Sequence, residues 1–112
     1  MAGKLTTHVL DISRGTPAAG MKVSLFREGK LIRTAVTNRD GRIDGPMAAG
    51  EEFGEGSWRL EFSVGDYFGM SDLGAGGFLD VVPVAFKVDG SGRDYHVPLL
   101  VSPWSYSTYR GS

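Results

Sequence analysis

Cysteine is absent from the sequence, and histidine occurs only twice. The absence of cysteine excludes disulfide bonds, thiol nucleophiles and thiolate metal sites. The two histidines show neither the His-x-His nor the His-Glu-x-x-His spacing of metal sites, so we expect no metal ion and no other cofactor. A G-x-S-x-G nucleophile elbow and a phosphate loop ending in Gly-Lys-Ser/Thr are also missing, which removes two familiar classes of enzyme.

The chain also lacks an excess of charge and a long apolar run. Its 12 basic and 13 acidic residues give a formal net charge of -1, which predicts neither nucleic acid nor an anionic membrane as a partner. No apolar run approaches the ~20 residues that a membrane helix needs. The first ten residues, MAGKLTTHVL, lack the apolar segment of a secretory signal. We therefore expect a cytoplasmic protein, with the periplasm and the peroxisome left open as alternatives.

Length and composition are typical of one ordered domain. The 112 residues are enough for a single continuous core, and we take 1–112 as one domain. The 17 glycines and 5 prolines are accompanied by 6 Phe, 4 Tyr and 2 Trp, a number of aromatic residues that a disordered chain does not have. The glycines are therefore interpreted as turns between short strands.

Several segments alternate apolar and polar residues, the pattern of half-buried β-strands. In WRLEFSV, for example, Trp58, Leu60 and Phe62 share one face. Strands are expected at 7–12, 21–27, 31–37, 58–64, 81–88, 95–101 and 105–111. The stretch 65–78 lacks this period, and one short helix is expected there around 67–73. Seven or eight short strands with close turns predict an all-β fold, a two-sheet antiparallel β-sandwich.

Three local signals refine this prediction. The sequence EGK at 28–30 predicts a tight hairpin between the strands on either side of it. Asp40 and Gly41 predict a second turn, directly before Arg42. Pro83 lacks a backbone N–H and therefore predicts that its strand lies at a sheet edge or carries a bulge.

Both histidines are predicted to lie within strands and to face away from the core. In YHVPLLV, His96 lies on the face opposite the apolar set that begins with Tyr95; in the first strand, His8 shares a face with Thr6. A strand histidine or an arginine taken alone is usually structural or solvated, so none of these residues supports a function singly. Neutral imidazoles with guanidiniums and hydroxyls do, however, suit a hydrolase that activates water.

Three blocks of sequence resemble a known family. They are LTTHVLDISRGTPAAGMKVSLFR at the start, TNRDGR with WRLEFSVGDYF in the middle, and YHVPLLVSPWSYSTYRGS at the end. In this order and spacing they resemble the 5-hydroxyisourate hydrolase branch of the transthyretin-like family. The closing Tyr-Arg-Gly-Ser is the tetrapeptide that marks this enzyme branch and is missing from the hormone carriers.

The resemblance implies roles for particular residues. It implies that His8, Arg42, His96 and Ser112 are catalytic. It also implies that the remaining residues of the tetrapeptide, Tyr109, Arg110 and Gly111, bind substrate. Which histidine acts as the base stays open at this point.

The resemblance also implies a fold, an assembly and a reaction. The family fold is an eight-stranded transthyretin-like sandwich with one short helix, assembled into a homotetramer that is a dimer of dimers. Active sites lie where the dimers meet, around a central channel. The implied reaction is hydrolysis of the N1–C6 bond of 5-hydroxyisourate to 2-oxo-4-hydroxy-4-carboxy-5-ureidoimidazoline, a step in the degradation of urate to allantoin.

Two alternatives and one departure accompany this interpretation. Several family members have SPYGYSTYRGS where this chain has Trp104 and Ser105 in place of Tyr and Gly, which predicts a local difference at the channel. One alternative function is a non-catalytic carrier of a small ligand, which the two histidines and the tetrapeptide argue against. The other is a monomeric β-sandwich interaction module, which a stable tetramer would contradict.

Overall fold

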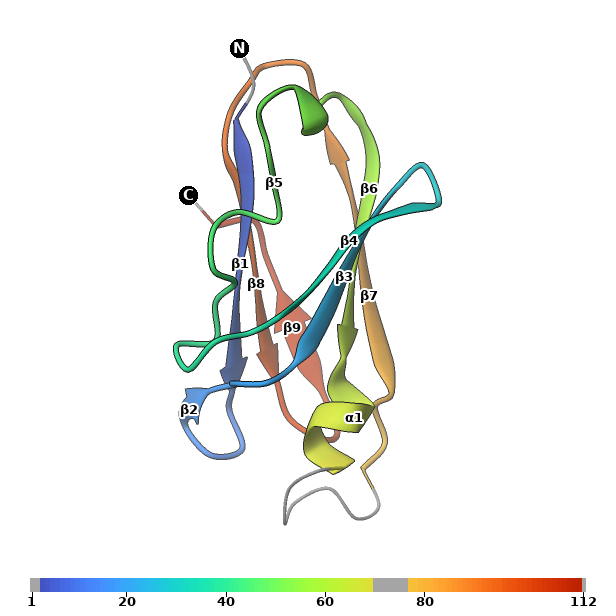
Figure 1. Ribbon diagram of the computed structural model, residues 1–112. Coiled ribbons are helices and arrows are strands. Elements are labelled where there is room, and N and C mark those ends of the chain that lie inside the picture. The colour runs from blue at the N-terminus through green and yellow to red at the C-terminus, as the bar shows by residue number, and fades with distance from the viewer. Residues whose placement is uncertain (1–2, 70–76, 112) are drawn as a thin grey trace.

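The computed structural model describes residues 3–69 and 77–111 as a two-layered β-structure (Figure 1). Its strands are β1 (Lys4–Asp11), β2 (Thr16–Pro17), β3 (Lys22–Arg27), β4 (Lys30–Val36), β5 (Ala48–Ala49), β6 (Gly56–Ser63), β7 (Val81–Val88), β8 (Tyr95–Val101) and β9 (Tyr106–Thr108). One α-helix, α1 (Val64–Gly69), and one 3-10 turn (Gly50–Glu52) complete the described elements. The predicted all-β sandwich with one short helix is confirmed.

The strands form two sheets that pack face to face. The first sheet has the order β2-β1-β8-β9, and β5 also pairs with β1. The second sheet has the order β4-β3-β6-β7. Strand β7 is thus an edge strand, as Pro83 predicted.

One strand pair departs from the antiparallel prediction. Strands β1 and β8 run parallel, with Thr6 opposite His96 and His8 opposite Pro98, whereas the other strand pairs of the described residues are antiparallel. The alternation of apolar residues tells which face of a strand is buried, but it carries no information on strand direction. The two strands come from opposite ends of the chain, so no hairpin turn links them and a parallel arrangement is open to them.

The alternating residues build the core between the two sheets. In β1 every second residue from Leu5 is buried, and in β6 the buried residues are Trp58, Leu60 and Phe62. The indole N–H of Trp58 donates to the Gly54 carbonyl at 3.0 Å, so its polar atom is satisfied in the core. The inner faces of both sheets are therefore largely apolar, although the buried set of β1 includes Thr7 and Asp11, and His8 and His96 are left on the outer face.

The predicted hairpin and the predicted helix are both present. Glu28 and Gly29 have φ values of 49° and 82°, the left-handed conformation of a tight two-residue hairpin between β3 and β4. Helix α1 begins at Val64, three residues earlier than expected, and residues 70–73 of the expected helix lie outside the described residues.

Helix α1 lies at one end of the sandwich and is tied to β1. The Tyr67 hydroxyl donates to the buried Asp11 carboxylate at 2.8 Å.

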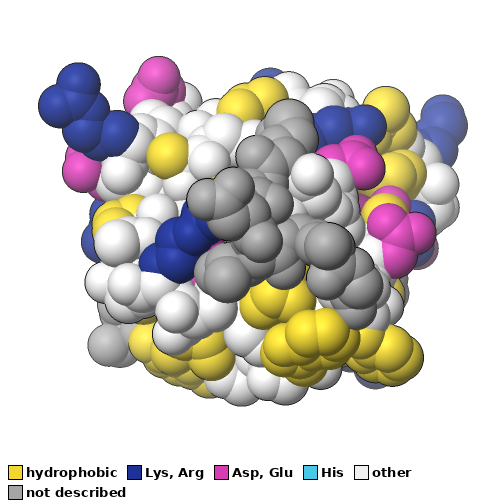
Figure 2. All heavy atoms as spheres, turned by 90° about the horizontal axis from the view of Figure 1, so that it is seen from below, with side chains coloured by type: hydrophobic (Ala, Val, Ile, Leu, Met, Phe, Trp, Pro, Cys, Tyr) yellow, Lys and Arg dark blue, Asp and Glu magenta, His cyan; other side chains and the backbone are white. Residues whose placement is uncertain are grey.

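The end of the molecule that carries α1 faces the viewer in Figure 2, where hydrophobic side chains reach the surface along one side. Among the described residues, no helix has the length and apolar character needed to cross a membrane.

Candidate functional site

Both histidines lie on the outer face of the sheet formed by β1 and β8. His8 and His96 are half-buried, while their strand neighbours Val9 and Val97 point into the core. The prediction that both histidines face away from the core is confirmed. Because β1 and β8 are adjacent and parallel, the two imidazoles project from neighbouring strands on one side of the sheet.

A turn at 38–41 places Arg42 beside His8. The side-chain carbonyl of Asn38 accepts the backbone N–H of Asp40 at 2.9 Å and that of Arg42 at 3.2 Å. The Asn38 N–H in turn donates to the Arg42 carbonyl at 2.7 Å, so the side chain and backbone of one residue hold the whole turn. Arg42 then forms an isolated antiparallel bridge with His8.

Gly41 lets this turn approach β1 closely. Its φ is +75°, and its carbonyl accepts the Val9 N–H at 2.8 Å. A Cβ at this position would collide with the backbone oxygen of Val9. Both the left-handed conformation and the close approach therefore require glycine, and both are needed to bring Arg42 to the histidines.

His96 is held from two sides. Its Nδ1 lies 2.8 Å from the Thr6 hydroxyl, and its backbone oxygen accepts the Gly111 N–H at 2.7 Å. Burial, followed by the charges of Arg42 and His8, lowers the pKa of His96 below its ordinary value. The imidazole is therefore neutral at physiological pH, the protonation state that a base requires.

An open hollow of about 360 Å³ lies at this place. It is lined by Lys4, Thr6, Arg42, Asp94 and His96. A hollow of this size is in the range of small-molecule sites. It combines a neutral imidazole with two cationic side chains, an arrangement that can take a proton from water and stabilise a developing oxyanion. Within 3–69 and 77–111, no three His, Asp or Glu side chains lie close enough together to hold a metal ion.

Sequence reasoning did not single out Lys4, Thr6 or Asp94 as site residues. Thr6 was identified as a face-mate of His8, but its position opposite His96 depends on the parallel register. Asp94 lies in the loop before β8, where its carboxylate accepts the Lys4 backbone N–H at 3.0 Å. Only the pairing of the two chain ends brings these residues together.

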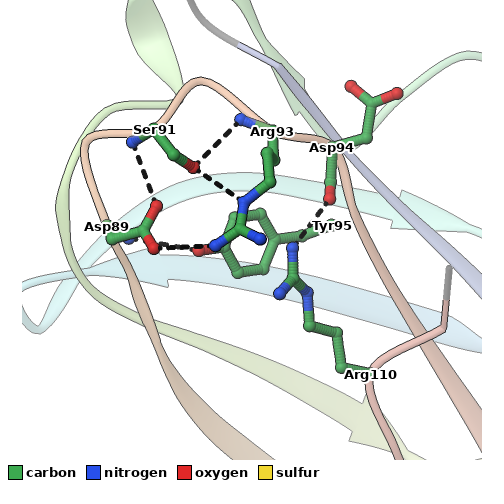
Figure 3. A network of polar contacts seen from close by, with 6 residues as sticks. All are labelled: Asp89, Ser91, Arg93, Asp94, Tyr95 and Arg110. Atoms are coloured by element: carbon green, nitrogen blue, oxygen red, sulfur yellow. Dashed lines mark hydrogen bonds and ion pairs between the residues drawn. The ribbon is translucent and has the colours of Figure 1, made fainter.

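The tetrapeptide residues divide between the two faces of the sheet. Gly111 lies beside His96, whereas Tyr109, which is 60% exposed, lines a different hollow together with Arg110. The Arg110 guanidinium lies 4.1 Å from the centroid of the Tyr95 ring and donates to the Asp94 backbone carbonyl at 3.2 Å (Figure 3). Tyr95 belongs to the core, so Arg110 does not point into the hollow around His96. Ser112 lies outside the described residues.

Comparison with known proteins identifies relatives along nearly the whole chain. A model of the HIUase/Transthyretin family matches residues 5–111. The chain is 50% identical over 117 residues to 5-hydroxyisourate hydrolase 2 of Rhizobium meliloti (strain 1021), with 99% of this chain and 98% of the relative covered. The solved structure of Klebsiella pneumoniae 5-hydroxyisourate hydrolase is 36% identical, with a TM-score of 0.86 and coverage of 98% of this chain and 99% of that one.

Two further structures share the fold. Sea bream transthyretin, solved in complex with thyroxine, is 31% identical, with a TM-score of 0.86 over 96% of this chain and 94% of that one. An (S)-allantoin synthase is 44% identical with a TM-score of 0.88; the match covers 98% of this chain but only 44% of the synthase chain. The chain belongs to the HIUase/Transthyretin family.

Proposed function

We propose that this chain hydrolyses 5-hydroxyisourate. The observation that carries the proposal is the meeting of Arg42 and His96 in one hollow, with His8 bridged to Arg42, in a chain that matches hydrolases of this substrate along its whole length. A fold shared equally with a thyroxine-binding transthyretin does not separate catalyst from carrier. The neutral base beside a guanidinium is what favours the enzyme over the carrier.

The reaction is the opening of the six-membered ring at the N1–C6 bond. His96, neutral because of its lowered pKa, takes a proton from water, and the hydroxide attacks C6. The C6 carbonyl electrons move to oxygen, where the Arg42 guanidinium stabilises the negative charge. Collapse of this intermediate breaks the C6–N1 bond, and N1 takes up the proton held by His96. C6 becomes a carboxylic acid, which loses its proton to solvent and gives the carboxylate of the ureidoimidazoline product.

The remaining residues have supporting roles in this proposal. His8, on the neighbouring strand, orients the water. Gly111 bounds the substrate pocket beside His96, and Tyr109 and Ser112 keep the substrate-binding and catalytic roles that the resemblance implies. Arg110 was expected to contact substrate, but its contact with Tyr95 supports a different task, the anchoring of the tetrapeptide to the core.

We further propose that the protein is a homotetramer, a dimer of dimers, with its active sites where the dimers meet. Strands β7 and β9 end their sheets without a further partner among the described residues. Phe78 and Trp104 are 75% and 60% exposed. Their segments are joined by the Phe78 N–H, which donates to the Pro103 carbonyl at 3.0 Å. Native mass spectrometry tests the assembly; a monomer would refute it.

The cytoplasm stays the proposed compartment, to be tested by cell fractionation.

A direct assay tests the activity. 5-Hydroxyisourate is generated freshly from urate with urate oxidase, and the loss of its ultraviolet absorbance is followed with and without the protein. We expect acceleration above the spontaneous decay, and loss of that acceleration in His96→Asn and in Arg42→Ala. A tetrameric wild-type protein without acceleration would refute the hydrolase and favour the carrier. Near-normal rates in either variant would refute the assigned roles.

A further inference from the structure

The His96 ring has a close neighbour at each of the two ring atoms next to Cγ, the atom that joins the ring to the rest of the side chain. On one side, Nδ1 lies 2.8 Å from the Thr6 hydroxyl. On the other, the ring faces the Cα of Gly111, where a Cβ would come within 2.7 Å of Cδ2. Thr6 is directly opposite His96 in the parallel register, so the contact is built into the pairing of β1 with β8.

This confinement directs the far edge of the ring away from the sheet. Nδ1 and Cδ2 are the two ring atoms next to the side-chain attachment, and both are occupied by neighbours. Nε2 lies beyond them and has no hydrogen-bond partner among the described residues. The two nitrogens of His96 are therefore in different environments, which is the condition for fixing one tautomer of a neutral imidazole.

We propose that Thr6 is a positioning residue for His96, whose Nδ1–H donates to the Thr6 hydroxyl and whose Nε2 therefore carries the lone pair. This inference rests on the proposed hydrolase function and assigns Nε2 as the atom that takes the proton from water. The opposite arrangement, with the Thr6 hydroxyl donating to Nδ1, would place a hydrogen on Nε2 and leave it unable to act as a base.

The charged groups around His96 favour a hydrogen bond donated by Nδ1–H to the Thr6 hydroxyl, which leaves the lone pair on Nε2. Lys4 from β1 and Arg42, which follows the turn at 38–41, line the hollow with N–H donors, and His8 lies on β1 beside the strand of His96. The Asp94 carboxylate, from the loop before β8, already accepts a backbone N–H. A lone pair on Nε2 gives this donor-rich hollow an uncharged acceptor that can hold water against the substrate.

Gly111 completes the arrangement from the other side, and Arg110 holds Gly111 in place. The Gly111 N–H donates a hydrogen bond to the His96 carbonyl. The residue before it, Arg110, stacks its guanidinium on Tyr95 and so helps to hold Gly111 in place. The end of the chain thus restricts the His96 ring through its backbone. The hydrogen bond to Thr6 fixes the tautomer of His96, and the close approach of Gly111 restricts rotation of its ring.

The experiment compares Thr6→Val, which keeps the shape and removes the hydroxyl, with Thr6→Ser, which keeps the hydroxyl. Thr34→Val serves as the matched control, because Thr34 is a strand threonine whose hydroxyl lies 3.2 Å from that of Ser24 on the other sheet. Long-range ¹H–¹⁵N correlation spectra of the assembled protein report which nitrogen of His96 is protonated. Initial rates with 5-hydroxyisourate give kcat and KM.

We expect wild type, Thr6→Ser and Thr34→Val to show a protonated Nδ1 and a bare Nε2. Thr6→Val should show a mixture of tautomers and a kcat lowered about tenfold, with KM nearly unchanged. A wild-type protein with its proton on Nε2 would overturn the proposal, as would a Thr6→Val variant with wild-type tautomer and kcat. The expected tautomer in a wild-type protein that does not hydrolyse 5-hydroxyisourate would refute the proposed function while still supporting the hold of Thr6 on His96.

Discussion

The replacement of Gly41 by alanine should damage the site more than it damages the fold. Gly41 has a φ of +75°, and its Cβ would collide with the Val9 oxygen, so the turn must move away from β1. The restoration of an ordinary contact distance of roughly 3.5 Å requires a shift of about 1 Å. Arg42 follows directly and moves with the turn. A misplacement of about 1 Å can lower a catalytic rate about 100-fold.

The expected loss of stability is smaller and can be separated into two parts. Alanine in the left-handed conformation costs about 1–2 kcal/mol wherever it occurs. Loss of the 2.8 Å hydrogen bond from Val9 to Gly41 adds about 1 kcal/mol. Gly45→Ala is the matched control, because Gly45 has a φ of +78° with nothing within 4 Å of the added Cβ. Gly45→Ala should lose the stability that alanine costs in the left-handed conformation, but it should not lose a hydrogen bond to β1.

The assay measures kcat/KM with 5-hydroxyisourate and the free energy of unfolding in urea for both variants. We expect Gly41→Ala to lose about 100-fold in kcat/KM and about 2–3 kcal/mol of stability. Gly45→Ala should keep its activity and lose about 1–2 kcal/mol. Equal activities in the two variants would refute the idea that the close approach of Gly41 to β1 positions Arg42.

Three further predictions concern Gly111, His96 and Tyr67. Gly111→Ala should abolish hydrolysis with little loss of stability, because its Cβ would lie 2.7 Å from the His96 ring; Gly90→Ala, with a contact at 3.4 Å, should be active. The acid limb of the pH–rate profile should lie below pH 6.5, because burial and nearby charge lower the pKa of His96; a limb above pH 6.5 would contradict its role as base. Burial and the hydrogen bond to Asp11 raise the pKa of Tyr67 to about 12, so this tyrosine stabilises the fold fully below pH 10 and loses that contribution as the pH rises towards 12. Urea unfolding between pH 9 and 12 should show this loss in wild type and not in Tyr67→Phe.

Local patterns in the sequence predicted the strands and their buried faces. The alternation around Trp58 and around His96 reflects a property that each strand carries by itself, so the inner and outer residues followed directly. Pro83 predicted an edge strand because its missing N–H is tolerated there. The extent of α1 was less accessible, since short helices depend on packing and α1 is fixed by a contact between Tyr67 and the distant Asp11.

The parallel pairing of β1 and β8 was not predictable in the same way. No turn connects these strands, and the faces of His8 and His96 are the same for either strand direction. Thr6 and Asp94 became site residues only through this pairing. The contact of Arg110 with Tyr95 is a comparable case, because Tyr95 belongs to a different strand and to the core.

The site depends on two glycines that attach separate segments to the paired strands β1 and β8. Gly41 attaches the turn that carries Arg42 to β1, and Gly111 attaches the chain end to β8; the resulting isolated bridges involve His8 and His96. In both places a side chain would occupy the space in which the neighbouring strand or ring lies. A residue without a side chain therefore lies against each of the two proposed catalytic segments and sets its position. This explains why a glycine belongs in each motif, in DGR as well as in the closing tetrapeptide, although neither glycine offers a group that could react.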